Sequence, residues 1–400
     1  MHVLESFALN TGLKIDKPYI YEKFIPLSIN EDEKYIIVHP YTDSKSKNYK
    51  YWTETLNILI SLFRDTKYKI LLLGEVTNLN PNNVIVQTLP DYAQLAFLIK
   101  RCEAFVGTDS IGTQIASSYN KKLLAIHSNF PPENTGPYWG DEENKRIIDV
   151  SRVNGLPSYS DDEKDPKAIN TIKPEQIAKE ICELINLKYE YPYKTLYIGK
   201  EYTNRKVELI PESYLLNYRD FMIDSVIVRM DLHYNLSALE KQLTVSSCSL
   251  VTNKPIDTKL IEKYKSRITE LIYFVEGKLS EEESQFYDAL RSLGVVYHLA
   301  SRLTGDDLNK FKLDYLDYPP ILEIPYGNKS DVEKKIKNKS NIHYKSSSLI
   351  VKGTKFYDNL LLDSHGNREI STIISEPKPV IDEEVFWRGL SNTMILEKTS

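Results

Sequence analysis

Side chains that can hold a phosphate or a sugar hydroxyl gather in one segment near residue 110. The sequence Phe105-Val-Gly-Thr-Asp-Ser-Ile-Gly-Thr-Gln-Ile-Ala116 is typical of a β-strand, a turn and the start of a helix. A helix start offers unpaired backbone N–H groups and a positive dipole end, which favour a phosphate. Ser110 and Thr113 add hydroxyl donors, and Asp109 can accept hydrogen bonds from sugar or ribose hydroxyls. The alternative is that Asp109 or Ser110 only caps the helix.

Two more polar segments follow expected strands. The loop after the first strand carries Lys45, Lys47 and Lys50, which favour an anionic diphosphate, although it can also be a plain solvated loop. Glu75 follows the next strand, where a carboxylate can hold ribose or sugar hydroxyls or can be an exposed turn residue. Because parallel strands end at one edge of a sheet, these loops would converge on one crevice.

The elements that must position these loops alternate between strand and helix up to about residue 187. Strands are expected at 35–39, 69–73, 84–87, 104–106 and 123–126, and helices at 51–63, 92–100, from about 112, and at 174–187. The strands are apolar nearly throughout. Strands of this kind, separated by helices, predict a parallel sheet that is covered on both faces.

A second α/β series follows between about 195 and 318. Strands are expected at 225–230, 248–251, 270–275 and 295–299, and helices at 236–243, 260–268 and 281–293. The stretch 348–357 predicts a β-hairpin. The expected organisation is an N-terminal helix and linker (1–30), a Rossmann-like domain (31–188), a second, smaller Rossmann-like α/β domain (195–320) and a β-rich C-terminal appendage (321–400).

Composition narrows the class of protein. The chain has 400 residues and a net charge of -5, which argues against a nucleic-acid binder. Three cysteines that lie far apart fit neither a disulfide scaffold nor a zinc ribbon, and no metal site is expected. No secretory signal and no apolar run of about 20 residues is evident, so we expect a cytoplasmic protein without a membrane span.

The first α/β region resembles a known family over residues 35–140. It is similar to the C-terminal, donor-binding domain of family-nine glycosyltransferases, the ADP-heptose:lipopolysaccharide heptosyltransferase type. The features that carry the resemblance are, in chain order, His39-Pro40, Lys50-Tyr51-Trp52, Gly74 with Glu75, a leucine-rich helix over 89–99, Asp109 to Ala116, and Thr135-Gly136-Pro137-Tyr138. Residues 1–25 look like the end of the family's first domain.

The resemblance implies a GT-B-type fold and a nucleotide-diphosphate sugar as co-substrate, with no cofactor and no metal. In the family, the lysine matching Lys50 approaches the diphosphate, and the acidic residue matching Glu75 holds the ribose. The pair matching Asp109 and Ser110 contacts sugar and phosphate. The expected donor-binding residues are Thr42, Lys50, Glu75, Asp109, Ser110, Gly112, Thr113 and Gln114.

This sequence departs from the family's pattern at two kinds of place. The signature glycine is Ile111, which would crowd a diphosphate, and the signature histidine is Gln114, which carries no charge. Almost nothing precedes residue 35, where the family has its acceptor domain with a general base. Asp231, which lies beside Arg229 and His233 after an expected strand, is the one candidate base for the acceptor proton, and otherwise a strand-end residue.

Three readings therefore stay open. The first is a glycosyltransferase that moves a hexose or heptose from a nucleotide-diphosphate sugar to a glycan or lipopolysaccharide-like acceptor. The second is a catalytically degenerate module that acts in binding or assembly. The third is one half of a split enzyme, with a second polypeptide supplying the acceptor domain.

Overall fold

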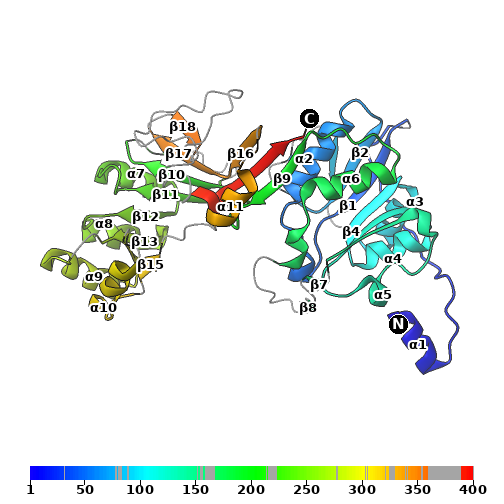
Figure 1. The fold of residues 1–400 in the computed structure, drawn as a ribbon, viewed down its shortest axis with the longest axis horizontal. Helices are drawn as coiled ribbons and strands as arrows, with labels where there is room; N and C mark the ends of the chain where they lie inside the picture. The colour runs from blue at the N-terminus through cyan, green and yellow to red at the C-terminus, as the bar shows by residue number, and fades with distance from the viewer. Residues whose placement is uncertain are drawn as a thin grey trace. The chain divides into compact units, whose positions relative to one another are not determined.

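The chain forms two compact α/β units, Met1–Thr195 and Leu196–Lys398. The computed structural model describes residues 1–30, 32–76, 79, 83–87, 90–150, 152–153, 156–157, 167–212, 214, 223–275, 278–301, 303, 305–319, 321–323, 329–337, 339, 341–352, 355–358 and 389–399. Each unit contains a large parallel sheet, as Figure 1 shows. The predicted α/β class is confirmed.

The first unit has a six-stranded parallel sheet in the order β3-β2-β1-β4-β5-β6. The strands are β1 (Lys34–His39), β2 (Tyr68–Leu73), β3 (Val84–Gln87), β4 (Ala104–Thr108), β5 (Lys122–His127) and β6 (Lys145–Asp149). This is the strand order of the Rossmann fold, in which the winding direction reverses between the first and fourth strands. Loops that leave β1 and β4 therefore diverge and open a crevice at the carboxyl edge of the sheet.

Helices cover both faces of this sheet because its strands are apolar on both faces. Ile36, Ile37 and Val38 of β1 are all completely buried, which predicts a central strand. The helices are α2 (Trp52–Phe63), α3 (Tyr92–Arg101), α4 (Ile111–Ser118), the short α5 (Pro132–Thr135) and α6 (Pro174–Leu184). Helix α2 packs with α6, and α3 packs with α4.

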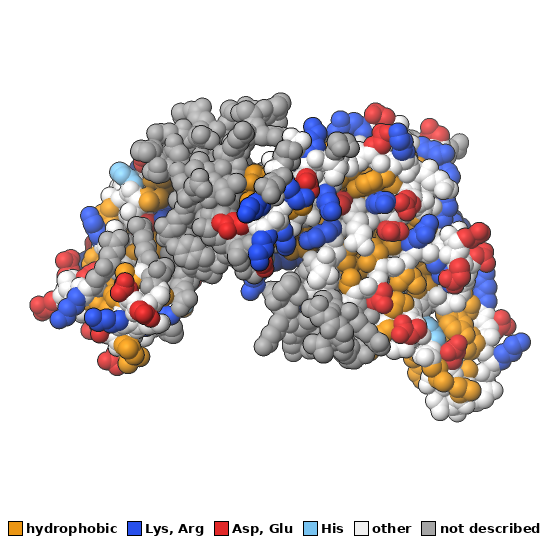
Figure 2. All heavy atoms as spheres, viewed as in Figure 1, with side chains coloured by type: hydrophobic (Ala, Val, Ile, Leu, Met, Phe, Trp, Pro, Cys, Tyr) orange, Lys and Arg blue, Asp and Glu red, His pale blue; other side chains and the backbone are white. Residues whose placement is uncertain are grey.

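The N-terminal segment lies against the first unit with little burial of its own. Helix α1 (Val3–Thr11) is capped by His2, whose ring accepts the Leu4 N–H, and it ends at Gly12, whose φ of 71° is left-handed. None of the nine described α1 residues is buried, and Phe7 and Leu9 are 63% and 73% exposed. Figure 2 shows apolar side chains gathered at this end of the unit.

The segment after α1 is tied to α3. Glu22 pairs with Lys100 and Arg101 at 2.5 and 3.0 Å, and the Lys23 N–H donates to Ala93 O at 3.1 Å. These contacts hold residues 18–21 beside the carboxyl edge of the sheet, where they take part in the pocket described below.

The second unit has an eight-stranded sheet in the order β15-β14-β13-β12-β11-β10-β17-β18. Its strands are β10 (Lys206–Ile210), β11 (Ser225–Arg229), β12 (Cys248–Thr252), β13 (Ile268–Phe274), β14 (Tyr297–Ser301), β15 (Ile321–Glu323), β17 (Ser348–Lys352) and β18 (Lys355–Asp358). All neighbours are parallel except the β17–β18 hairpin. The helices are α7 (Leu236–Val245), α8 (Thr258–Tyr264), α9 (Glu281–Leu293) and α10 (Gly305–Asp314).

The C-terminal region differs in part from the separate appendage expected over 321–400. The predicted hairpin is present, but β15 and β17 extend the second unit's main sheet, since β17 pairs in parallel with β10. A three-stranded sheet joins β16 (Ile342–Ser346) and β19 (Thr393–Lys398) to β9 (Tyr193–Ile198), and α11 (Lys329–Ile336) also lies in this region. Residues 353–354, between the two strands of the hairpin, lie outside the described residues.

Candidate functional site

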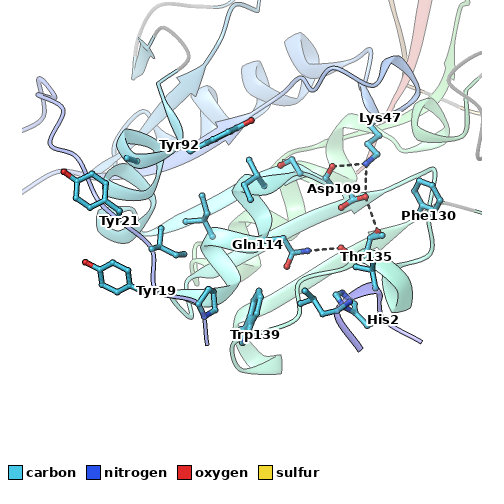
Figure 3. A pocket seen from close by; sticks show the side chains of 18 residues that line it. His2, Tyr19, Tyr21, Lys47, Tyr92, Asp109, Gln114, Phe130, Thr135 and Trp139 are labelled. Carbon is cyan, nitrogen blue, oxygen red and sulfur yellow. Dashed lines mark hydrogen bonds and ion pairs between the residues drawn. The ribbon is translucent and has the colours of Figure 1, made fainter. Parts of the chain in front are cut away.

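A lysine and an aspartate meet where the first sheet reverses its winding. Lys47, from the loop after β1, places its Nζ 2.9 Å from Oδ2 of Asp109, which follows β4. Thr135, at the end of α5, donates its hydroxyl to the same oxygen at 3.1 Å. Lys47 and Asp109 are only 19% and 13% exposed, so water screens the pair less than it would at the surface. Figure 3 shows these three side chains together.

A single-turn 3-10 helix, η1 (Lys45–Lys47), aims Lys47 at Asp109. Its central residue, Ser46, is completely buried and accepts a hydrogen bond from Asn129 Nδ2 at 2.5 Å. Ser128 donates to the backbone oxygen of Ser46 at 3.2 Å. The loop after β5 therefore holds η1 in place, and η1 in turn sets the position of the lysine.

The Lys47–Asp109 pair forms part of the wall of a pocket of about 910 Å³. Figure 3 shows Tyr19, Tyr21 and Tyr92 on one side of this pocket and the pair on the other. The lining residues are His2, Val3, Leu4, Pro18, Tyr19, Ile20, Tyr21, Lys47, Tyr92, Ala93, Asp109, Ser110, Ile111, Gln114, Ile115, Phe130, Thr135 and Trp139. Its size is that of a site for a small organic molecule.

Gln114, in the pocket wall, connects α4 to the loop that follows α5. Its Nε2 donates to the backbone oxygens of Thr135 and Gly136 at 2.9 and 3.0 Å. Its Oε1 and the hydroxyl of Ser110 are buried and make no hydrogen bond with any residue in the described part of the chain. Buried polar atoms of this kind are normally satisfied by water or a ligand.

Gly112 and Thr113 shape the start of α4. A Cβ added to Gly112 would lie 2.5 Å from Cζ of Phe105, so a glycine is needed for α4 to pack on β4. The Thr113 hydroxyl donates to the Ser110 backbone oxygen at 2.6 Å, and the side chain is 1% exposed. Neither residue lines the pocket, so the structure gives both a local structural role.

Lys50 faces a second hollow, of about 430 Å³, on the other side of η1. This hollow is lined by Tyr41, Lys45, Asn48, Tyr49, Lys50, Lys167 and Asn170. The Lys50 backbone N–H donates to Asn170 Oδ1 at 2.9 Å, and Lys167 Nζ donates to the Lys45 backbone oxygen at 2.7 Å. Three lysines in one polar hollow favour an anion.

Thr42 and Glu75 are the other two predicted donor-binding residues at this edge of the sheet, and neither lines either hollow. The Thr42 N–H donates to Asn48 Oδ1 at 2.8 Å, and its hydroxyl donates to Ser44 O at 3.3 Å, which folds the loop. Glu75 follows β2 and is exposed.

Asp231, the candidate base, lies in the second unit in a buried ion pair. Its two oxygens each accept a hydrogen bond from Arg229 at 2.8 Å, and its side chain is 1% exposed. Arg229 also pairs with Glu208. Burial alone would lower the pKa of Arg229, but the hydrogen bonds and charges of Asp231 and Glu208 raise it further above its usual value. This geometry is typical of a structural ion pair and leaves Asp231 committed to Arg229.

Two histidines lie at strand ends of the first unit, His39 half-buried and His127 completely buried. Burial lowers the pKa of His39, at the end of β1. Burial also lowers the pKa of His127, at the end of β5, and the nearby charge of Asp109 opposes that shift only in part. Neutral imidazoles there can donate or accept a hydrogen bond at neutral pH but add no charge to the crevice.

Lys47 and Thr135 were missing from the predicted site residues. Lys47 belongs to the basic loop singled out in the sequence, but the Lys50-Tyr51-Trp52 pattern pointed to its neighbour. Thr135 belongs to a loop that the resemblance already included. No spacing rule links either residue to Asp109, because η1 and α5 bring them there through tertiary contacts.

Two classes of feature are absent from the part of the chain that the structure describes. No three histidine, cysteine, aspartate or glutamate side chains there are grouped to hold a metal ion. The helices described there are all too short or too polar to cross a bilayer.

Comparison with known proteins gives distant matches only. No family model and no curated protein matches the chain. Among solved structures, ADP-heptose LPS heptosyltransferase II from E. coli is 18% identical, with a TM-score of 0.32, and the match covers 40% of this chain and 48% of that one. A family 9 glycosyltransferase from Veillonella parvula is 16% identical, with a TM-score of 0.33 and coverage of 40% and 48%.

A third match is TibC, a dodecameric iron-containing glycosyltransferase from enterotoxigenic E. coli, at 14% identity, a TM-score of 0.30 and coverage of 40% and 49%. The chain thus spans about half the length of these structures, at 48%, 48% and 49%. The Rossmann order of the first unit rests on its own sheet topology and is independent of these matches.

Proposed function

We propose that the first unit binds a nucleotide-diphosphate sugar and that the chain transfers the sugar to a glycan or other acceptor. The observation that carries the proposal is the meeting of Lys47 and Asp109 at the switch point of the sheet, in the wall of a 910 Å³ pocket. Ligands of open parallel sheets bind at such switch points. The resemblance seen in the sequence points to the same ligand class.

The two hollows beside η1 suit the two ends of this donor. The lysine hollow, with Lys45, Lys50 and Lys167, would take the diphosphate, assisted by the positive end of α2. On the other side of η1, Asp109 and the unpartnered Ser110 hydroxyl can hold sugar hydroxyls. The exposed Glu75 at the end of β2 can accept the ribose hydroxyls.

Transfer in this arrangement needs no metal. The acceptor oxygen bonds to the anomeric carbon as the bond from that carbon to the diphosphate breaks, and the nucleoside diphosphate leaves with the electron pair. Lysines and a helix N-terminus stabilise the charge that develops on the leaving group. The acceptor proton goes to a general base. The candidate from the sequence, Asp231, belongs to the second unit, where both of its carboxylate oxygens accept hydrogen bonds from Arg229.

A thermal-shift panel with ADP-, UDP- and GDP-sugars tests the proposal directly. One nucleotide series should raise the melting temperature, and Asp109→Ala and Lys50→Ala should each abolish the rise. Lys14→Ala is the matched control, because Lys14 is exposed and lines neither hollow. If no nucleotide sugar stabilises the protein, the donor-binding proposal is wrong.

A binding function without turnover is the second candidate, and two residues favour it. Ile111, half exposed in the pocket wall, occupies the signature glycine position, and Gln114 is committed to the loop at Thr135. Nucleoside diphosphate release, measured with and without candidate acceptors, separates the two. If nucleotide sugars stabilise the protein and nucleoside diphosphate is released, sugar transfer is supported. If nucleotide sugars stabilise the protein without release of nucleoside diphosphate, a binding module or one half of a split enzyme is supported.

Asp231→Asn distinguishes a catalytic from a structural aspartate. As a base, Asp231 is needed for turnover, so Asn would lower kcat at unchanged melting temperature. As the Arg229 partner, it is needed for stability, so Asn would lower the melting temperature of the second unit.

A further inference from the structure

The large pocket of the first unit has two chemically different sides. Figure 3 shows Lys47, Asp109 and Thr135 clustered on one side, and the rings of Tyr19, Tyr21 and Tyr92 on the other. The polar side offers hydrogen-bonding groups, and the far side offers ring faces and aliphatic carbon.

The non-polar side exposes carbon to water in the absence of a ligand. Tyr19, Tyr21 and Tyr92 are 92%, 68% and 72% exposed, and Ile111 is 50% exposed. Apolar surface gathered around one hollow is typical of a binding site, because covering it releases ordered water. The N-terminal segment, the start of α3 and the start of α4 supply these side chains from distant parts of the sequence.

The charge of the pocket decides between classes of ligand. Lys47 and Asp109 are the only lysine, arginine, aspartate or glutamate side chains among its lining residues, and they pair with each other. A diphosphate would find no unpaired cation here, whereas three lysines line the hollow beside η1. The large pocket therefore favours an uncharged ligand that has hydroxyls at one end and carbon at the other.

We infer that this pocket binds an amphipathic acceptor, with a hydroxylated head group at Asp109 and an alkyl or aromatic body against Tyr19, Tyr21 and Ile111. The inference rests on the proposed function, in which the donor sugar lies at Asp109 and its diphosphate lies in the lysine hollow. The acceptor hydroxyl would then lie next to the donor sugar at Asp109. Oδ1 of Asp109 makes no hydrogen bond within the described residues, so this oxygen is available to the head group.

A series of n-alkyl β-D-glucosides from methyl to octyl, each kept below its micelle concentration, tests the inference by calorimetry. Burying a CH₂ group is worth about 0.8 kcal/mol, so each added carbon should tighten binding about fourfold until the pocket is filled. Asp109→Asn should weaken the whole series by a similar factor and leave the dependence on chain length unchanged.

Two variants locate the alkyl chain. Ile111→Ser replaces a half-exposed side chain in the wall and should flatten the dependence on chain length. Leu9→Ser is the matched control, because Leu9 is an exposed leucine of α1 outside the pocket. If the dependence of affinity on alkyl-chain length survives Ile111→Ser but is lost in Leu9→Ser, the alkyl chain lies on α1 and the inference is overturned. Equal affinity for all glucosides of the series also overturns it.

The donor panel keeps this inference separate from the proposed function. Chain-length-dependent glucoside binding without any nucleotide-sugar stabilisation would retain an amphipathic ligand site but overturn its assignment to an acceptor. Nucleotide-sugar stabilisation with no glucoside binding would leave the donor proposal standing and remove the acceptor class.

Discussion

Gly112→Ala tests whether the glycine of the site serves packing or ligand approach. The added Cβ would lie 2.5 Å from Phe105 Cζ, and Phe105 is completely buried, so the ring has little room to move. Overpacking of this kind costs about 1–3 kcal/mol, and replacing a helical glycine by alanine returns up to about 1 kcal/mol. The net loss should be about 1–2 kcal/mol, or about 2–8 °C in melting temperature for a unit of this size.

The assay is chemical denaturation of the unliganded protein, followed by the same substitution in a Phe105→Leu background. Leucine lacks the ring carbon that meets the new Cβ, so Gly112→Ala should be neutral or stabilising there. The positive coupling in this double-mutant cycle is the signature of the clash. Gly112→Ala that keeps full stability and loses only ligand binding would refute the packing argument and return Gly112 to the ligand-binding residues.

Three further predictions concern other parts of the site and the second unit. Burial lowers the pKa of His127 below 6.5, so the unfolded chain binds more protons than the folded chain as the pH drops below 6.5. The stability that depends on His127 should therefore be full above pH 6.5 and fall as the pH drops. His127→Gln should reduce the difference between the urea midpoints at pH 7.5 and pH 5.5. Arg229→Met strands two carboxylates and should destabilise the second unit by about 3–5 kcal/mol in a denaturation curve, whereas an unchanged midpoint would make the pairs incidental. The double variant Lys50→Gln, Lys167→Gln should weaken nucleotide-sugar binding by about five- to twentyfold and reduce the dependence of that binding on salt. Titrations at two ionic strengths measure both effects. An unchanged salt dependence would place the diphosphate elsewhere.

The first sheet was predictable because its strands carry their own signal. Each central strand is a short apolar run buried on both faces, and the helices between them keep one apolar stripe. Both edge strands are poorly buried, but only one was missed. Strand β3 (Val84–Gln87) was predicted because Val-Ile-Val is an apolar run, whereas three of the five residues of β6 (Lys145–Asp149) are charged.

Long-range pairing in the second unit was less accessible to sequence analysis. Strand β17 lies beside β10, although more than a hundred residues separate them. Local propensity indicated the hairpin, but it carries no information about which earlier strand the hairpin would join. The short, charged helices α10 and α11 were missed for a related reason, since few of their residues are apolar.

The neighbourhood of Asp109 was predictable only as a set of loops, and the choice among lysines was not. The sequence places Lys45, Lys47 and Lys50 within six residues, so any of them can reach the end of β4. Burial of Ser46 against Asn129 turns η1 so that Lys47 faces Asp109 and Lys50 faces away. A contact between loops after β1 and β5 thus divides one basic segment between two hollows.

Gln114 helps to set the surroundings of Asp109. Gln114 holds two backbone oxygens of the loop after α5, and that loop presents the Thr135 hydroxyl to Asp109. A neutral amide provides both donors without a charge, whereas a protonated histidine would add a cation to the pocket. The Gln114 amide therefore holds Thr135 and Gly136 in place without adding a charge to the pocket, which suits an uncharged head group.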